Sequence, residues 1–480
     1  MSRQLERVGP GVWQIPPSGG MRVPARVYAT EELLAAIRDD RSLDQACNVA
    51  HLPGIVTASL AMPDVHEGYG FPIGGVAAFD ADSGVVSPGG VGYDINCGVR
   101  LMRTDVVASE LGDRLSRLVH QIQRDVPAGV GSEGAISTLS SRDLDDVLRR
   151  GAAWAVENGY GRPEDLDHTE ARGCLEDADP AALSHRARER GAPQLGTLGS
   201  GNHFAELQVV EEVLDTTAAA AFGLVPGHMT VLLHSGSRGL GYQVCDDALG
   251  AMHEGARRHG IPLPDAQLVA VPVGSAEGKR YLAAMWAAAN FAWANRQVMM
   301  ALIERACSRV LGGGRASLGF RLVYDVAHNI AKLEDHLVEG ERRRLVVHRK
   351  GATRAFPAGH AEVPAEYRDV GQPVLIPGDM GRASFVCVGT QKAMRETFGS
   401  AAHGAGRLLS RHAARRAGAG RNIADELAQR GVTVAARSTK TLAEEMPEAY
   451  KDAAEVVEGL RLAGIALPVA RLRPIGVVKG

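Results

Sequence analysis

The chain has 480 residues, enough to bury a large core, and its 53 Lys and Arg residues nearly balance its 56 Asp and Glu residues, giving a formal net charge of -3. This balance excludes a global excess of charge as the basis for binding nucleic acid or a membrane surface, so any phosphate site has to be a local cluster. Six scattered cysteines without a CxxC pair, and no apolar run of about 18 residues or more, predict a protein of the reducing cytoplasm.

Short helices and strands alternate in the first part of the chain. Thr30-Glu31-Glu32 has the form of a helix N-cap followed by an acidic first turn. Residues 55–62 are apolar and predict a buried strand. Helical spacing predicts helices over 108–126 and 142–158, whereas the charged segment 161–193 fits either a surface excursion or a partly helical cap.

The mixed pattern continues to the end of the chain. Apolar runs at 229–233 and 321–326 predict strands, and 281–311 predicts a long helix interrupted by polar residues. The segment HGAGR at 403–407 predicts a helix N-terminus, whose free N–H groups favour an anion such as phosphate. Because no linker divides the chain, we expect one large mixed α/β unit over residues 1–480.

A glycine-dense turn, GGVGYDINCGVR at 89–100, carries Asp94 and Cys97 three residues apart. Glycine permits backbone conformations that aim a carboxylate and a thiolate at one point in space. This pair suggests a metal site. Taken alone, the turn also fits a structural role in which Cys97 packs as a small hydrophobic residue.

Three histidines favour the metal. His203 follows a glycine loop, and His234 and His328 each follow an apolar run, so all three are expected at strand ends, where sheets hold active-site groups. Carboxylate, thiolate and imidazole ligands suit Zn, Mn, Fe or Co better than Ca or Mg. Five ligands exceed one tetrahedral site, so we expect a Cys97 thiolate that bridges two metals, although each histidine alone also fits a core position.

These motifs resemble the RtcB family of RNA ligases, which join an RNA 3'-phosphate end to a 5'-hydroxyl end. The resemblance extends along nearly the whole chain. It rests on GGVGYDINCGVRL at 89–101, GTLGSGNHFAE at 196–206, HSGSRGLG at 234–241, HNIAK at 328–332, VHRKGATRAFPAGH at 347–360, PGDMG at 377–381, HGAGR at 403–407 and Val478-Lys479-Gly480.

The resemblance implies a guanylylated histidine. His403, which by itself fits either a phosphate-binding cation or a nucleophile, becomes the catalytic residue that takes GMP from GTP and releases pyrophosphate. GMP then caps the RNA 3'-phosphate as RNA-(3')pp(5')G, and the 5'-hydroxyl displaces it. RNA with a 2',3'-cyclic phosphate is the related substrate, tRNA splicing or RNA repair is the role, and an activating protein is a further partner to consider. Two Mn²⁺ ions are implied on Asp94, Cys97, His203, His234 and His328.

The matched blocks also imply substrate contacts and a fold. Glu206 is expected to accept guanine N–H donors and Lys479 to meet the base carbonyl or a phosphate, and RNA phosphates are assigned to Arg238 and Lys350. The implied architecture is α+β, with mixed β-sheets around a central metal and nucleotide cleft and helices outside. The implied GTP contacts are Asn202, His203, Phe204, Ala205, Glu206, His328, Asn329, Pro377, Gly378, Asp379, Met380, Ser384, His403, Gly404, Ala405, Gly406 and Lys479.

Two other functions fit the same residues. A dinuclear-metal phosphodiesterase or RNA end-processing enzyme would use the cleft without a covalent nucleotide. An RNA-binding accessory protein would keep the metal as a structural element and would bind RNA without Cys97. His403 discriminates the first of these from the ligase, because a hydrolase does not need a residue that carries a nucleotide.

Overall fold

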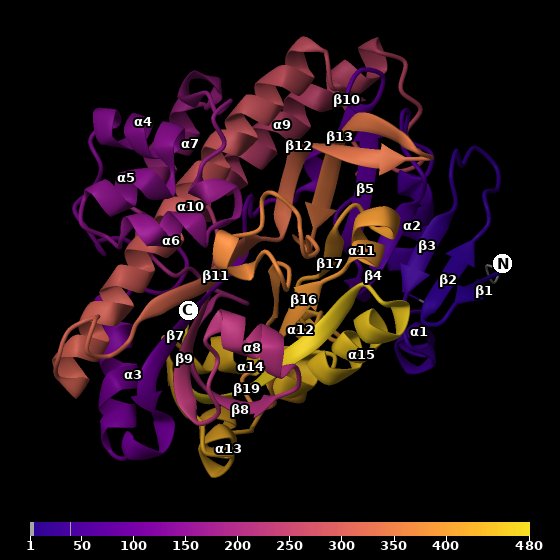
Figure 1. Ribbon diagram of the computed structural model, residues 1–480. Coiled ribbons are helices and arrows are strands. Elements are labelled where there is room, and N and C mark those ends of the chain that lie inside the picture. Colours follow the sequence, from indigo (N-terminus) through magenta and orange to yellow (C-terminus); the bar gives the residue numbers. More distant parts are fainter. Residues whose placement is uncertain (1–3, 39) are drawn as a thin grey trace.

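Two large mixed β-sheets form the centre of the computed structural model, which describes residues 4–38 and 40–480 (Figure 1). Most neighbouring strands are antiparallel, but β3 pairs with β4 and β18 with β19 in parallel. The first sheet has the order β1 (Glu6–Gly9), β2 (Val12–Ile15), β3 (Ala25–Tyr28), β4 (Ser59–His66), β5 (Ile73–Asp80), β13 (Glu341–Lys350) and β12 (Asn329–Val338).

The second sheet supplies most of the strand ends that matter for function. Its order is β11 (Arg321–Ala327), β7 (Gly98–Val107), β9 (His228–Ser235), β8 (Phe204–Val213), β19 (Ala466–Lys479), β16 (Ser384–Gly389) and β15 (Pro373–Ile376), with β18 (Thr433–Ala436) beside β19. Two short ladders join β6 (Val85–Val86) to β10 (Val271–Pro272) and β14 (Ala352–Arg354) to β17 (Ser400–Ala402).

Helices cover the outside of the sheets, and α4–α7 gather beside the long helix α10, away from strands β1–β3 (Figure 1). The expected mixed α+β class with outer helices is therefore confirmed. The helices are α1 (Glu31–Ile37), α2 (Ser42–Val49), α3 (Arg114–Asp125), α4 (Ser141–Arg150), α5 (Ala152–Glu157), α6 (Pro163–Asp167), α7 (His185–Gly191), α8 (Thr216–Phe222), α9 (Arg238–Arg258), α10 (Ala276–Leu311), α11 (Gln391–Glu396), α12 (Arg411–Ala417), α13 (Ile423–Gln429), α14 (Thr439–Glu444) and α15 (Ala453–Ala463).

Helix α10 is buried on nearly every side, as a helix enclosed by other elements has to be. Its N-terminal half packs Trp286 and Phe291 into a core shared with α4, α5 and α9. Its C-terminal half packs Met299 and Ile303 into a second core shared with α3 and the second sheet. One helix thus joins two hydrophobic cores.

The polar residues inside α10 are paired with buried partners. Arg296 has no exposed surface, and its guanidinium donates to both carboxylate oxygens of Asp325 on β11 at 2.7–3.1 Å. Arg100 on β7 donates to the same carboxylate at 3.2 Å. A carboxylate shared by two buried arginines ties α10 to two strands of the second sheet.

Several expected elements are confirmed. Thr30 caps α1, because its hydroxyl accepts from the backbone N–H of Leu33. The strands expected at 229–233 and 321–326 are β9 and β11, and the long helix expected at 281–311 is α10. The undecided segment 161–193 is partly helical, since it contains α6 and α7.

Two expectations about boundaries need correction. The strand expected at 55–62 is β4, which begins at Ser59, because Thr57 has a φ of 64° that interrupts the extended chain, and Ile55 before it makes only an isolated bridge to Phe79. The helix expected over 142–158 is two helices, because Gly151 has a φ of 54° and an added Cβ would lie 2.0 Å from the carbonyl oxygen of Gly173.

The helix expected to begin at His403 is wrong. His403 follows β17 in a turn, and α12 begins only at Arg411, capped by Ser410. The glycines of this segment serve close approach instead. Gly406 has a φ of 73°, and an added Cβ would lie 2.2 Å from the carbonyl oxygen of Asp64 on β4.

Within residues 4–38 and 40–480, each helix is too short or too polar to cross a membrane.

Replacement of Asp325 tests the link between α10 and the second sheet. Asp325→Ala leaves Arg100 and Arg296 buried without their carboxylate, so the free energy of unfolding should fall by about 3–5 kcal/mol in chemical denaturation. Asp105→Ala is the matched control, because Asp105 pairs with Arg103 at the surface with 59% of its side chain exposed, and its loss should cost about 0–1 kcal/mol. Equal costs for both variants would contradict this account.

Candidate functional site

The five expected metal ligands come together from strands of the second sheet and the loops next to them. Asp94 and Cys97 lie in the turn before β7, His203 precedes β8, His234 lies near the end of β9, and His328 lies between β11 and β12. The strand pairing explains their convergence, because β9 pairs with both β7 and β8, and β7 also pairs with β11.

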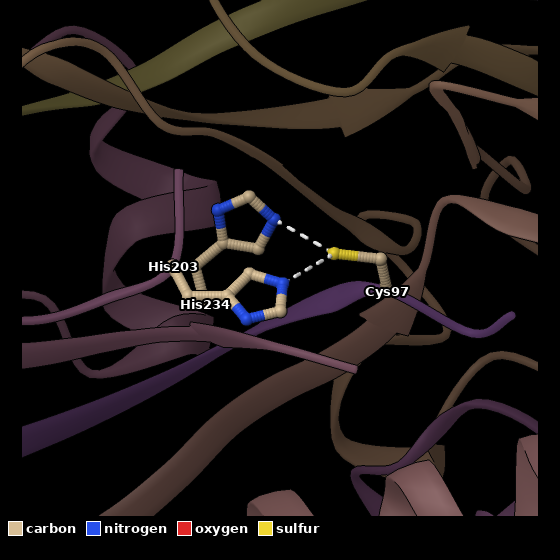
Figure 2. Close-up of side chains that lie close together, drawn as sticks. All are labelled: Cys97, His203 and His234. Atoms are coloured by element: carbon tan, nitrogen blue, oxygen red, sulfur yellow. Dashed lines mark hydrogen bonds between the residues drawn. The ribbon is translucent and has the colours of Figure 1, made fainter. Parts of the chain in front are cut away.

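Cys97 lies at the centre of this group. Figure 2 shows the imidazoles of His203 and His234 turned toward its sulfur, with the Cys97 Sγ 3.3 Å from His203 Nε2 and 3.2 Å from His234 Nε2. His203 Nε2 is 2.8 Å from the Asp94 carboxylate, and His234 Nε2 is 3.2 Å from His328 Nε2. The ligand side chains therefore form a chain of contacts from Asp94 through His203, Cys97 and His234 to His328, and the ligand atoms of Cys97, His203 and His234 all lie within 4.8 Å of one another.

The donor set fits divalent metal ions. Burial, followed by the positive charge of neighbouring imidazoles, lowers the pKa of His234 and His328 well below its usual value, so both rings are neutral and carry a lone pair. The ring of His203 is oriented by its Nδ1, which donates to the carbonyl oxygen of Leu198 at 2.9 Å, so that Nε2 faces Cys97 and Asp94.

Burial and the Asp94 charge raise the pKa of the Cys97 thiol well above its usual value. A divalent cation between the two groups would reverse that shift, as it does for any coordinating thiol.

Helix α10 fixes the loops that carry these ligands. Arg296 Nη1 donates to the carbonyl oxygen of Asn96 at 2.7 Å and to that of Ser235 at 3.0 Å, the neighbours of Cys97 and His234. Asn295 accepts from the backbone N–H of Gly196 at 2.7 Å, at the start of the loop that leads to His203. Two consecutive residues of one buried helix thus set the positions of three ligands.

A cavity of about 570 Å³ opens beside the metal ligands. Glu206 and Phe204 reach its wall from alternate positions of β8, whereas Ala205 between them packs into the core on the other face of the sheet. The expected nucleotide contacts that line it are Asn202, Phe204, Glu206, His328, Asn329, Pro377, Gly378, Asp379, Met380, His403, Gly404, Ala405, Gly406 and Lys479.

Other expected contacts lie behind the cavity wall. Ser384 is buried, where its hydroxyl receives a hydrogen bond from Gln208 at 3.0 Å and one from the backbone N–H of Gly378 at 3.1 Å. It therefore supports the loop at 377–380 from behind. His203 is buried beside Cys97 and does not line the cavity, so it is better placed to bind a metal than to contact a nucleotide.

His403 lies in the cavity with its Nδ1 held by Asp64. The Asp64 carboxylate accepts from the backbone N–H of His403 at 2.9 Å and lies 2.5 Å from its Nδ1. Asp64 is fully buried on β4, so the carboxylate fixes both the backbone and the ring. Because a carboxylate favours the proton on Nδ1, the lone pair of His403 lies on Nε2. The His403 ring centroid is 4.8 Å from that of His328, next to the metal ligands.

The part of the cavity where the nucleotide is expected contains buried ionisable groups. Burial raises the pKa of Glu206 to about 8. Lys479 lies nearby, with its Nζ 5.2 Å from the ring centroid of Phe204 and 3.7 Å from the carboxylate of Glu445. Burial raises the pKa of the Glu445 carboxyl, but the positive charges of Lys479 and Arg407 lower it by more. The pKa of this carboxyl therefore lies below its usual value.

The two expected RNA contacts occupy different depths. Arg238 begins α9, and it donates to the Thr197 hydroxyl at 3.2 Å and to the carbonyl oxygen of Gly129 at 3.3 Å. Lys350 lines the cavity but is 5% exposed, and its Nζ donates to the carbonyl oxygen of Tyr69 at 2.6 Å. Burial lowers the pKa of Lys350 to about 7.

Sequence reasoning missed Asp64 and the polar pair on α10. Asp64 lies in the segment MPDVHEGYG, whose polar residues and glycines follow an apolar run, which is a usable signal. Arg296 interrupts an otherwise apolar helix, and a charged residue in such a place needs a buried partner. Neither signal identifies the partner, because Asp64 and His403 are 339 residues apart.

Comparison with known proteins agrees with the geometry. The sequence profile of the family described as "tRNA-splicing ligase RtcB" matches residues 45–480. The chain belongs to the RtcB family. Proteins named tRNA-splicing ligase RtcB from Thermococcus kodakarensis and Archaeoglobus fulgidus are 55% and 53% identical to it, each over 99% of both chains. The RtcB protein of Pyrobaculum aerophilum is 50% identical over the same share. RtcB membership makes the chain an enzyme of the RNA-ligase class and confirms the resemblance of its motifs.

Removal of the Cys97 sulfur tests its central place among the expected metal ligands of this RtcB protein. Cys97→Ser should weaken the binding of added Mn²⁺ or Co²⁺ at least about tenfold, because the sulfur lies against both His203 and His234. Cys174→Ser is the control, since Cys174 is half-buried and its thiol contacts the carbonyl oxygen of Arg149. Metal analysis after dialysis measures both, and an unchanged metal content in Cys97→Ser would refute this role of Cys97.

Proposed function

We propose that the chain is a GTP- and Mn²⁺-dependent RNA ligase that joins RNA 3'-phosphate or 2',3'-cyclic phosphate ends to 5'-hydroxyl ends. The observation that carries the proposal is the pair of Asp64 and His403, held in a cavity beside the metal ligands. A nucleophilic imidazole with a carboxylate on its other nitrogen is what a covalent nucleotide carrier needs. The proposed role is tRNA splicing or RNA repair.

His403 Nε2 would attack the α-phosphate of GTP. A P–N bond forms, the bond to the β-phosphate breaks, and pyrophosphate leaves. Asp64 keeps the Nδ1 proton in place and stabilises the positive charge that develops on the ring. The 3'-phosphate of RNA then displaces His403 to give RNA-(3')pp(5')G, and the 5'-hydroxyl attacks the RNA phosphate and releases GMP.

Two Mn²⁺ ions held by Asp94, Cys97, His203, His234 and His328 would neutralise the phosphate charges. The chain's own residues do the remaining work. Glu206 and Lys479 lie together on the nucleotide side and are suited to the donors and the carbonyl of guanine. Gly404 and Gly406 line the cavity and are suited to contact the nucleotide through their backbone. Asp379 caps its own turn by accepting from the backbone N–H of Gly381 at 2.9 Å.

The RNA phosphates are assigned to Arg238 and Lys350. The guanidinium of Arg238 lies near Asp94 and makes two hydrogen bonds, to the Thr197 hydroxyl and to the carbonyl oxygen of Gly129. Its remaining N–H groups can donate to a phosphate. We also propose that residues 1–480 act as one ligase unit, which is supported by a cavity whose lining runs from His66 to Lys479. The same proposal includes a cytoplasmic location for the protein and an activating protein as a further partner.

The covalent step is tested by intact mass after incubation with GTP and Mn²⁺. The protein should gain about 345 Da, on the order of one GMP, and lose it when RNA with a 3'-phosphate is added. His403→Ala should show no gain, whereas His412→Ala, which changes an exposed histidine of α12, should react as the unmodified protein does. RNA cleavage that persists in His403→Ala would favour the dinuclear phosphodiesterase.

Recognition of guanine should depend on the ionisation of Glu206. Its pKa of about 8 means that the carboxyl is mostly protonated at neutral pH and cannot accept two guanine N–H donors. The affinity for guanosine, which has no phosphate to titrate, should therefore rise up to about tenfold per pH unit between about pH 6 and pH 8 in calorimetry. Glu206→Gln should bind more weakly and without this slope; an equal slope in both proteins would assign the effect to another group.

A further inference from the structure

Four of the chain's nine tyrosines line the cavity, and three of them have their rings in contact. Tyr69 follows β4, Tyr93 lies in the glycine turn directly before Asp94, and Tyr242 lies on the first turns of α9. The rings of Tyr93 and Tyr242 are stacked, with centroids 4.8 Å apart and an interplanar angle of 23°. Tyr69 meets Tyr93 edge-on at 5.9 Å. We call Tyr69, Tyr93 and Tyr242 the tyrosine platform.

Tyr242 is the outer member of the platform and is 46% exposed. Covering a large exposed aromatic ring is favourable, because it removes apolar surface from water. A ring that a stacked neighbour already holds in place can therefore bind a flat ligand with little loss of conformational entropy. Tyr93 is only partly exposed and supports it from the turn that carries the metal ligand Asp94. The platform therefore has a fixed position relative to the reacting groups.

Positive charge accompanies the aromatic rings. The guanidinium of Arg190 on α7 lies 5.1 Å from the ring centroid of Tyr242. Its Nη1 donates to the Gln243 side chain at 3.1 Å, which keeps it against α9. Arg238 begins α9 four residues before Tyr242, and its guanidinium is held by the Thr197 hydroxyl and the carbonyl oxygen of Gly129. Aromatic rings beside arginines are typical of sites for single-stranded nucleic acid.

We propose that the tyrosine platform stacks a nucleobase of the single-stranded RNA next to the ends being joined, with Arg190 and Arg238 on the neighbouring phosphates. This inference rests on the proposed function, because it assigns the RNA of that reaction to a defined wall of the cavity. Stacking accepts any base and orients the strand without reading its sequence.

The position of the platform favours RNA over the guanine of GTP. The contacts among the ligand side chains run from Asp94 through His203, Cys97, His234 and His328 to His403. Tyr93 adjoins the Asp94 end, whereas His403, which would carry GMP, lies at the other end. Glu206 and Lys479, the groups suited to guanine, come from β8 and β19 and not from the turn or α9.

Binding of two RNAs of equal charge tests the platform. The probes are a short single-stranded RNA with a 5'-hydroxyl and a 3'-phosphate, and an abasic RNA of the same length and ends. Tyr242→Ala should weaken the binding of the first RNA about tenfold at constant salt without GTP, whereas Tyr242→Phe, which keeps the ring, should bind it as the unmodified protein does. The abasic RNA should bind all three proteins equally, which also shows that the variants are folded.

The inference is overturned if Tyr242→Ala binds the base-bearing RNA with unchanged affinity, or if it loses the same factor with both RNAs. It is also overturned if the affinity for GTP falls by that factor, because the platform would then hold guanine. The comparison does not depend on guanylylation. If the RNAs are distinguished but His403 gains no GMP, the platform stands and the proposed reaction fails.

Discussion

The site depends on the hydrogen bonds and the ion pair made by the buried guanidinium of Arg296. It has no exposed surface, it pairs with Asp325, and it donates to the carbonyl oxygens that adjoin Cys97 and His234. A buried charge of this kind is costly unless every donor is satisfied, so the loops around it are held to the geometry that satisfies it. Asn295 and Arg296 lie on one turn of α10, the helix that joins two hydrophobic cores. Together they hold the loops that carry the expected metal ligands Cys97, His203 and His234.

This support explains how ligands far apart in the chain share one centre. Asp94, Cys97, His203, His234 and His328 lie in turns or at strand ends, where a backbone has little to hold it. Residues beside Cys97 and His234, and the loop that leads to His203, are hydrogen-bonded to α10, which holds these three side chains together. His403 is positioned separately, by Asp64 of the other large sheet. The reaction we propose therefore takes place where the two sheets meet.

Much of the site could be predicted from the sequence, because its residues carry local signals. Asp94 and Cys97 stand in a glycine turn, His203 follows a glycine loop and precedes β8, and His234 and His328 stand at the ends of apolar runs that are indeed strands. The rest could not be predicted. The glycines after His403 are typical of a helix start, but here Gly406 serves close approach to Asp64 on β4 and Gly404 lies against Pro377. Asp64 and Arg296 contact residues that lie far away in the sequence and in other elements. A single sequence contains no local pattern that identifies such partners.

The central claim is that the chain uses a GMP-carrying histidine to join RNA through the phosphate already present at a 3' end. The most direct test isolates the guanylylated protein free of GTP and adds an RNA labelled at its 3'-phosphate together with a 5'-hydroxyl RNA, in a single turnover. The account predicts a joined strand with the label in the new phosphodiester and one GMP released for each junction. Release of the label as inorganic phosphate, or a junction without the label, would contradict it.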